Sequence, residues 1–129
     1  MRGDGRLWIA VGAASAFTAV AFGAFAAHGL SDARAQEVMR TGSTYEFFHA
    51  MAILACSALA RTAPRALIAP PIFLLGTALF SGSLYALALG APRWVGLITP
   101  FGGVAFLSGW GVVVWAALTA PPTVGPERT

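Results

Sequence analysis

Three side chains in this sequence have the types and the spacing that metal chemistry needs: His28, Glu46 and His49. Glu46 and His49 stand three positions apart, which places both on one face of a helix at the spacing that helical bundles use for metal ligands. With His28 from a neighbouring helix, the set offers two nitrogen ligands and one oxygen ligand, which suits zinc, iron or copper. The Glu-x-x-His pattern is common by itself, and the chain holds only one copy of it.

The composition indicates that these side chains belong to a membrane protein. Of the 129 residues, 57% are hydrophobic and 10% are charged, whereas about a quarter of the residues in a soluble domain are charged. The outer surface must therefore face lipid, and the length fits one domain. The eight basic residues stand singly or in pairs between apolar runs, which is typical of topology signals and not of a nucleic-acid-binding stripe.

Four long apolar runs predict an all-α bundle of four transmembrane helices. The runs cover residues 7–28, 45–61, 67–90 and 94–118. Ala24-Phe25-Ala26 mimics the cleavage site of a signal peptide, but the first run is long for a signal peptide, and we interpret it as a retained helix. The tail over residues 120–129 is rich in proline, and we expect it to be disordered.

Residues 31–44 form the one substantial polar stretch between the apolar runs. Ser31 or Asp32 suits the cap of a short helix, and Gly42 suits its end. We therefore expect a short interfacial segment between the first two spanning helices, lying along the membrane surface.

An even number of crossings places both chain termini on one side of the membrane. The arginine distribution favours the cytoplasmic side for them, by five residues against three. The five inner arginines are Arg2, Arg6, Arg61, Arg65 and Arg128, and the three outer ones are Arg34, Arg40 and Arg93.

This topology brings the notable polar side chains to a similar depth, in the outer half of the bundle. The candidate cluster comprises His28, Glu46, His49, Ser81, Ser83, Tyr85 and Thr99. The inner half is nearly free of polar groups, with Ser15, Thr18 and Ser57 as the main exceptions. One interpretation is structural, with hydrogen bonds of about 0.6 kcal/mol each joining the helices. The other two are the metal site and a site for a lipid headgroup or a quinone, with His and Tyr as donors.

Small residues recur along three of the runs and predict close helix packing, because they let neighbouring backbones approach one another in lipid. In the first run they are Ser15, Ala19, Gly23 and Ala27. In the third and fourth runs they are Ala78, Gly82, Ala86, Gly102, Gly103 and Gly109.

The motifs of common enzyme classes are missing from this sequence. It has no serine-nucleophile motif, phosphate-binding glycine loop or paired aspartates, so we expect no enzymatic activity and predict no cofactor. No charged residue stands in the middle of an apolar run, where ionisable groups mark ion and proton routes. The sequence also shows no inverted repeat, so we do not expect transport by this chain alone.

Four motifs follow one another along the chain. They are Gly23-Ala24-Phe25-Ala26-Ala27-His28-Gly29-Leu30, then Tyr45 with His49, then Leu79-Phe80-Ser81-Gly82-Ser83-Leu84-Tyr85, then Ile98-Thr99-Pro100-Phe101-Gly102-Gly103 with Gly109-Trp110. Together they resemble the signature of the DUF423 family over nearly the whole chain, with a departure at Ala26, where a glycine is expected. The resemblance implies a small multi-pass protein of the bacterial inner membrane. No function is established for that family, so it implies no catalytic residues.

These observations lead to two functional expectations. The first is a non-enzymatic accessory or assembly subunit that packs in the lipid against protein partners or further copies of itself. The alternative is a protein that binds a lipid, a quinone or a metal ion through the outer polar cluster. We expect no nucleic-acid partner.

Overall fold

The computed structural model describes the backbone of residues 2–125 and the side chains of residues 5–125. Over that range it contains helices and no strand. The elements are α1 (Arg2–His28), α2 (Ala33–Leu59), η1 (Pro64–Ile68), α3 (Ala69–Ala88), η2 (Arg93–Leu97) and α4 (Thr99–Leu118). The predicted all-α fold of four long helices is therefore confirmed.

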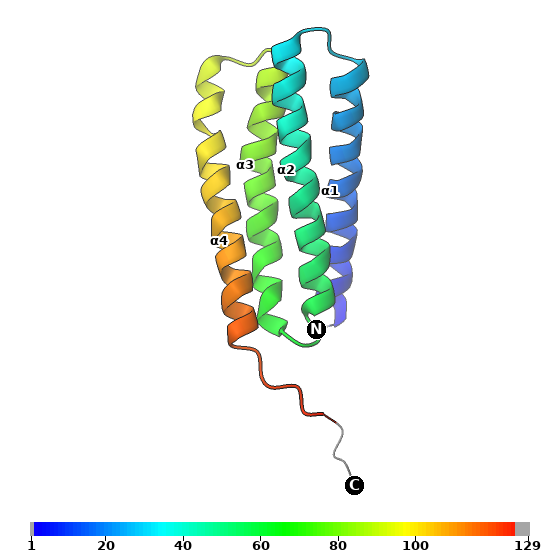
Figure 1. The fold of residues 1–129 in the computed structure, drawn as a ribbon, viewed down its shortest axis with the longest axis vertical. Coiled ribbons are helices and arrows are strands. Elements are labelled where there is room, and N and C mark those ends of the chain that lie inside the picture. The colour runs from blue at the N-terminus through cyan, green and yellow to red at the C-terminus, as the bar shows by residue number, and fades with distance from the viewer. Residues whose placement is uncertain (1, 126–129) are drawn as a thin grey trace.

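The four helices stand side by side in chain order, each antiparallel to the next (Figure 1). The main contacts join α1 to α2, α2 to α3, and α3 to α4. The inner pair is therefore α2 and α3, while α1 and α4 form the two edges. The chain enters α1 and leaves α4 at the same end of the bundle (Figure 1), as an even number of crossings requires.

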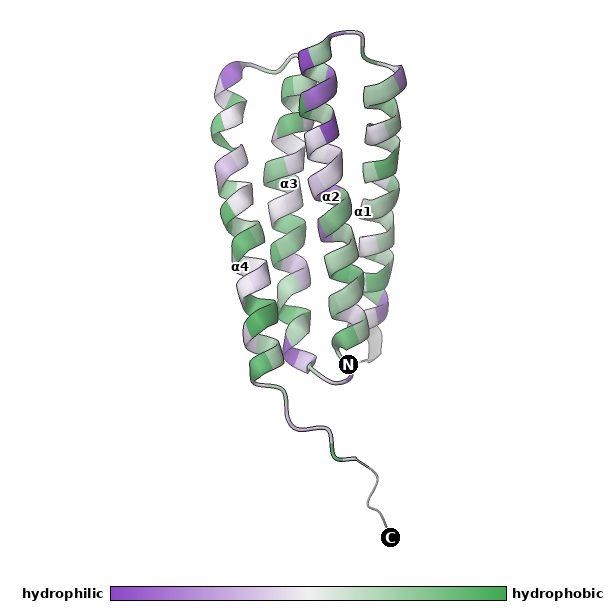
Figure 2. Cartoon of the chain, viewed as in Figure 1, coloured by the Kyte–Doolittle hydropathy of each residue, from purple (hydrophilic) through white to green (hydrophobic). Residues whose placement is uncertain are grey.

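Three of these helices are long and apolar enough to span a membrane by themselves. They cover Gly5–His28, Pro64–Ala88 and Arg93–Leu118. In Figure 2 the hydrophilic residues gather at the two ends of the bundle and in the first half of α2. Because of that polar half, α2 is not among the helices that are apolar enough to span a membrane by themselves. It lies between α1 and α3 and is covered by both.

The prediction of a separate interfacial segment over residues 31–44 is wrong. α2 begins at Ala33 and continues without a break through Gly42, so those residues form its first turns, parallel to the other helices (Figure 1). The predicted cap is correct, because the Asp32 carboxylate accepts a hydrogen bond from the backbone N–H of Ala35 at 2.8 Å.

Two features show how this polar stretch is accommodated within α2. The hydroxyls of Thr41 and Thr44 donate to backbone carbonyls one turn earlier, at 3.0 and 2.9 Å, so they need no water. Gly42 is a contact point and not a helix end, since a Cβ there would lie 2.8 Å from Cε1 of Tyr85. The glycine thus lets α3 approach α2.

The other helix ends follow local sequence signals. A 3₁₀ turn leads into α3, whose first turn holds Pro70, and α4 likewise has Pro100 in its first turn. Proline is tolerated there because its missing N–H would have no helical partner. Past the end of α3, Gly90 has a φ of 100°, a left-handed conformation that favours glycine. Residues 121–125 lack regular secondary structure, and residues 126–129 of the predicted disordered tail lie outside the described residues.

The packing face of α1 differs from the predicted four-residue repeat. Ser15 and Ala19 are buried and Gly23 contacts Ser43 of α2, but Ala27 is exposed, and Ala26 is buried instead. From Ser15 through Ala19 and Gly23 to Ala26 the steps are four, four and three residues, so the face shifts by one position at its last step.

The glycines of α4 divide into two kinds. Gly102 lies against the backbone of Phe80, where a Cβ would clash, and a Cβ at Gly109 would lie 2.5 Å from the Phe73 ring. Gly103 faces open space. On α3, Gly82 also faces open space, and two other predicted packing residues of α3 are exposed or half-buried: Ala78 and Ala86.

Candidate functional site

Glu46 lies at the middle of the bundle. It is the central residue of the 27-residue α2, as Ser15 is of the 27-residue α1. At 1.5 Å per residue, about 20 Å of helix extends to either side of the carboxylate, which places it near the centre of a hydrocarbon core about 30 Å thick. The expectation that no charged residue stands in mid-span is therefore wrong, because α2 begins at Ala33 and not at Tyr45.

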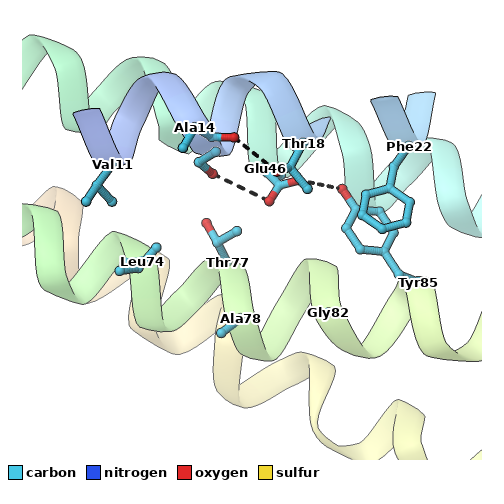
Figure 3. A pocket seen from close by; sticks show the side chains of 11 residues that line it. Val11, Ala14, Thr18, Phe22, Glu46, Leu74, Thr77, Ala78, Gly82 and Tyr85 are labelled. Carbon is cyan, nitrogen blue, oxygen red and sulfur yellow. Dashed lines mark hydrogen bonds between the residues drawn. The ribbon is translucent and has the colours of Figure 1, made fainter. Parts of the chain in front are cut away.

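The Glu46 carboxylate is held from both neighbouring helices. The Tyr85 hydroxyl on α3 donates to Oε1 at 2.9 Å, and the Ser15 hydroxyl on α1 lies 3.4 Å from Oε2 (Figure 3). Phe22 of α1 stacks on the Tyr85 ring, with centroids 4.0 Å apart and an interplanar angle of 19°. Glu46 itself is only 6% exposed. The carboxylate thus joins three helices through neutral partners.

Thr77 of α3 brings a further hydroxyl to the same place. The residue is 6% exposed, and its Oγ1 has no hydrogen-bond partner among the described residues. Figure 3 shows this hydroxyl pointing from α3 toward α1, into the space beside the Glu46 carboxylate. Hydroxyls in spanning helices commonly bond to the carbonyl one turn earlier, as Thr18 and Ser57 do here at 3.0 and 2.9 Å. No sequence signal shows that Thr77 departs from this habit.

These polar groups lie at the base of a groove between α1 and α3. Its volume is about 440 Å³, and Glu46 of α2 forms part of its floor (Figure 3). The two walls are apolar. One is formed by α1 and the other by α3, and they consist of Val11, Ala14, Phe22, Leu74, Ala78 and Gly82. The space exists because Ala14, Ala78 and Gly82 have little or no side chain. These residues leave room beside the helices instead of closing the gap between them.

His49 is buried on a different side of α2. Its Nδ1 lies 2.6 Å from the Tyr45 carbonyl, and its Nε2 accepts a hydrogen bond from Nε1 of Trp110 on α4 at 3.1 Å. Since the indole nitrogen only donates, Nε2 carries no proton and Nδ1 carries the single one. The ring also stacks on Phe106, with centroids 3.5 Å apart. Both nitrogens are engaged, so neither is free to bind a metal ion.

The three residues considered as metal ligands are not brought together. Glu46 faces α1 and α3, His49 faces α4, and His28 is exposed at the end of α1. Over the described part of the chain, no group of three His, Cys, Asp or Glu side chains has the geometry to hold a metal ion. The i, i+3 spacing puts Glu46 and His49 on adjacent faces of α2 that meet different neighbours.

The remaining predicted cluster residues lie between pairs of helices. The Ser81 hydroxyl donates to the Gly42 carbonyl at 2.7 Å and joins α3 to α2. The hydroxyls of Ser83 and Thr99 share a hydrogen bond of 2.6 Å and join α3 to the start of α4. These bonds fit the structural interpretation of the cluster for those three side chains.

Residue types alone did not reveal several of the side chains that surround Glu46 and His49. Ser15 was expected to serve helix packing, while Thr77, Phe22, Phe106 and Trp110 were not assigned to any site. All five stand in apolar runs, where periodicity does not say which face meets a polar neighbour.

Comparisons with known proteins place these features in context. The family model described as "Protein of unknown function (DUF423)" matches residues 22–103. A UPF0382 membrane protein of Haemophilus influenzae is 48% identical over 102 residues, which cover 76% of this chain and 82% of that protein. The UPF0382 inner membrane protein YgdD of Escherichia coli K12 is 42% identical over 118 residues, which cover 88% and 90%. No solved structure matches the chain.

Proposed function

We propose that this chain, which belongs to the DUF423 family of membrane proteins, binds an amphiphilic molecule of the membrane in the groove between α1 and α3. The observation that carries the proposal is the Thr77 hydroxyl, which is buried, points into the groove and has no partner among the described residues. A buried polar group without a partner costs about 1–3 kcal/mol. A ligand with a polar end supplies the missing partner.

The groove has separate polar and apolar parts, as the binding of an amphiphile requires. Its floor carries the Glu46 carboxylate and the hydroxyls of Ser15, Thr77 and Tyr85, whereas most of its lining is apolar. The volume of about 440 Å³ lies within the range of about 300–1,000 Å³ that is usual for small-molecule sites. In this proposal the protein is a binder and not an enzyme, and Glu46 and Tyr85 serve recognition.

Filling the groove tests this function. In Gly82→Leu the new side chain enters the groove, where a Cβ at Gly82 meets nothing within 4 Å, so the bundle itself is not strained. We expect native mass spectrometry of the wild-type chain, released from mild detergent, to detect a bound amphiphile. We expect the purified Gly82→Leu variant to lack it.

Gly111→Leu is the matched control. Gly111 lies on α4, also faces open space and does not line the groove. We expect it to keep the ligand. Loss of ligand from neither variant, or from both equally, would contradict the proposal.

A second candidate function is that of an accessory or assembly subunit. It is favoured by the edge position of α1, since only 17% of its apolar 18-residue window is buried within the chain. A pocket of about 460 Å³ also lies on α1, lined by Ala13, Ala16, Phe17, Val20 and Ala21. Such a face allows another helix to approach closely. The same mass spectra decide this candidate, because a partner or a second copy adds its own mass to the complex.

A further inference from the structure

We infer that the polar end of the groove ligand is a protonated amine, held between Oε2 of Glu46 and Oγ1 of Thr77. The inference rests on the proposed function and names the class of ligand: an alkyl chain that ends in an ammonium group. Three features of the groove lead to it, namely the charge of the floor, the unequal hydrogen bonding of the two carboxylate oxygens, and the position of Thr77.

Among the described residues, the Glu46 carboxylate has no cationic side chain within hydrogen-bonding distance. The carboxylate is bonded by two hydroxyls, those of Tyr85 and Ser15. Arg40, the nearest arginine along α2, is six residues away, or about 9 Å along the helix axis. A buried charge is costly unless it is paired, and ionisable groups within a membrane mark functional sites by default. A ligand cation is the complement that this position lacks.

The two carboxylate oxygens are not equally occupied. Oε1 accepts a bond of 2.9 Å from Tyr85, while Oε2 has only the 3.4 Å contact with Ser15. Oε2 therefore has room for a stronger donor. In Figure 3 the Thr77 hydroxyl points from α3 toward α1, into the space beside the Glu46 carboxylate. The two groups that lack a good partner thus face the same space.

An ammonium group matches this arrangement better than the other common polar ends. It has three N–H donors and no acceptor, so it can donate to Oε2 of Glu46, Oγ1 of Thr77 and Oγ of Ser15 together. An alcohol offers a single donor and no charge. A carboxylate would bring a second negative charge next to Glu46, which is repulsive. The alkyl chain then lies along Leu74, Ala78 and Gly82.

Three probes with the same chain length test the inference. We would measure binding of tritiated dodecylamine, dodecanol and dodecanoate to the full chain in phosphatidylcholine nanodiscs, with binding to empty nanodiscs subtracted. We expect dodecylamine to bind about tenfold more tightly than dodecanol, because charge-assisted hydrogen bonds are about twice as strong as neutral ones. In Glu46→Gln, which keeps an acceptor for Tyr85, this preference should disappear.

Two further variants complete the experiment. Glu37→Gln removes an exposed carboxylate in the first turns of α2 and should keep the preference for the amine. Thr77→Val keeps the charge and removes one acceptor, so it should reduce the preference even where Glu46→Gln fails to fold.

The outcomes separate this inference from the proposed function. Equal binding of dodecylamine and dodecanol, both blocked by Gly82→Leu, overturns the amine and leaves amphiphile binding in place. Binding of dodecanol or dodecanoate that is tighter than that of dodecylamine likewise overturns the amine and leaves amphiphile binding in place. If none of the three probes binds above the empty nanodiscs, the inference and the proposed function both fall.

Discussion

Two titratable side chains stand one turn apart on α2 and have different surroundings. His49 has both nitrogens bonded, and its ring stacks on Phe106 of α4 and contacts Phe73 of α3 at a tilt, so it acts as a polar part of the core. Glu46 is bonded on one oxygen more strongly than on the other and faces a groove. Completed hydrogen bonding therefore marks the structural residue, and incomplete bonding marks the candidate binding residue.

At the residue scale we predict that Trp110→Phe destabilises the fold. The substitution keeps an aromatic ring and removes the donor to His49 Nε2, so a buried acceptor remains without a partner. We expect a loss of about 1–3 kcal/mol in the free energy of unfolding, measured by titration with sodium dodecyl sulfate in mixed micelles. Trp94→Phe, at a highly exposed indole, is the control and should change little. Equal effects of the two substitutions would remove the structural role assigned to this bond.

At the scale of the elements, close helix contacts depend on particular glycines. Three glycines pack against aromatic rings: Gly42 against Tyr85, Gly76 against Phe106 and Gly109 against Phe73. Gly102 packs against the backbone of Phe80. A ring can shift to accept a methyl group, whereas a helix backbone moves only with its whole helix. Gly102 is therefore the least tolerant of these positions.

We accordingly predict opposite results for two neighbouring glycines of α4. Gly102→Ala places a Cβ against the backbone of Phe80 and must separate α3 from α4, at a cost of about 1–3 kcal/mol. Gly103→Ala meets nothing within 4 Å, and alanine favours a helix more than glycine does, so we expect no loss of stability. The same unfolding titration compares them. A stable Gly102→Ala variant would show that the two helices are less tightly packed than this structure has them.

At the scale of the whole molecule, the order of the helices creates the groove. Because α1 and α3 both pack on α2, the groove forms between them, with Glu46 in its floor. Small side chains on both walls keep it open toward the surrounding lipid. The site therefore belongs to the arrangement of three helices and not to any one of them.

The whole molecule also carries a prediction about orientation. The start of α1 and the end of α4 lie at the same end of the bundle (Figure 1), and the arginine distribution predicts the cytoplasmic side for that end. Fluorescent-protein fusions at either terminus should fluoresce in bacterial cells, whereas alkaline phosphatase fusions at either terminus should be inactive. Active alkaline phosphatase at both termini would show that the orientation is the opposite of the predicted one. Activity at one terminus alone would contradict an even number of membrane crossings.

The sequence by itself determined the class of protein and most of its helices. A chain with such long apolar runs and so few charges cannot cover its surface for water. In lipid the backbone of these runs must form its hydrogen bonds internally, so the four helices follow from the sequence, with approximate ends for all but the start of α2. The motifs around His28, Ser81 and Thr99 also pointed correctly to the family.

Only the tertiary structure decided which side chains meet. The start of α2 differs from the prediction because residues 33–44 are polar and lack the apolar run by which the other helices are recognised, although they are helical. That error in turn placed Glu46 near one membrane surface and not at the centre. His28, Glu46 and His49 seemed one cluster, yet each faces a different environment, because on helices that are apolar all round periodicity does not fix the direction of a face. The approach of α1 and α3 over α2 fixed those directions and brought Ser15 and Thr77 to the carboxylate.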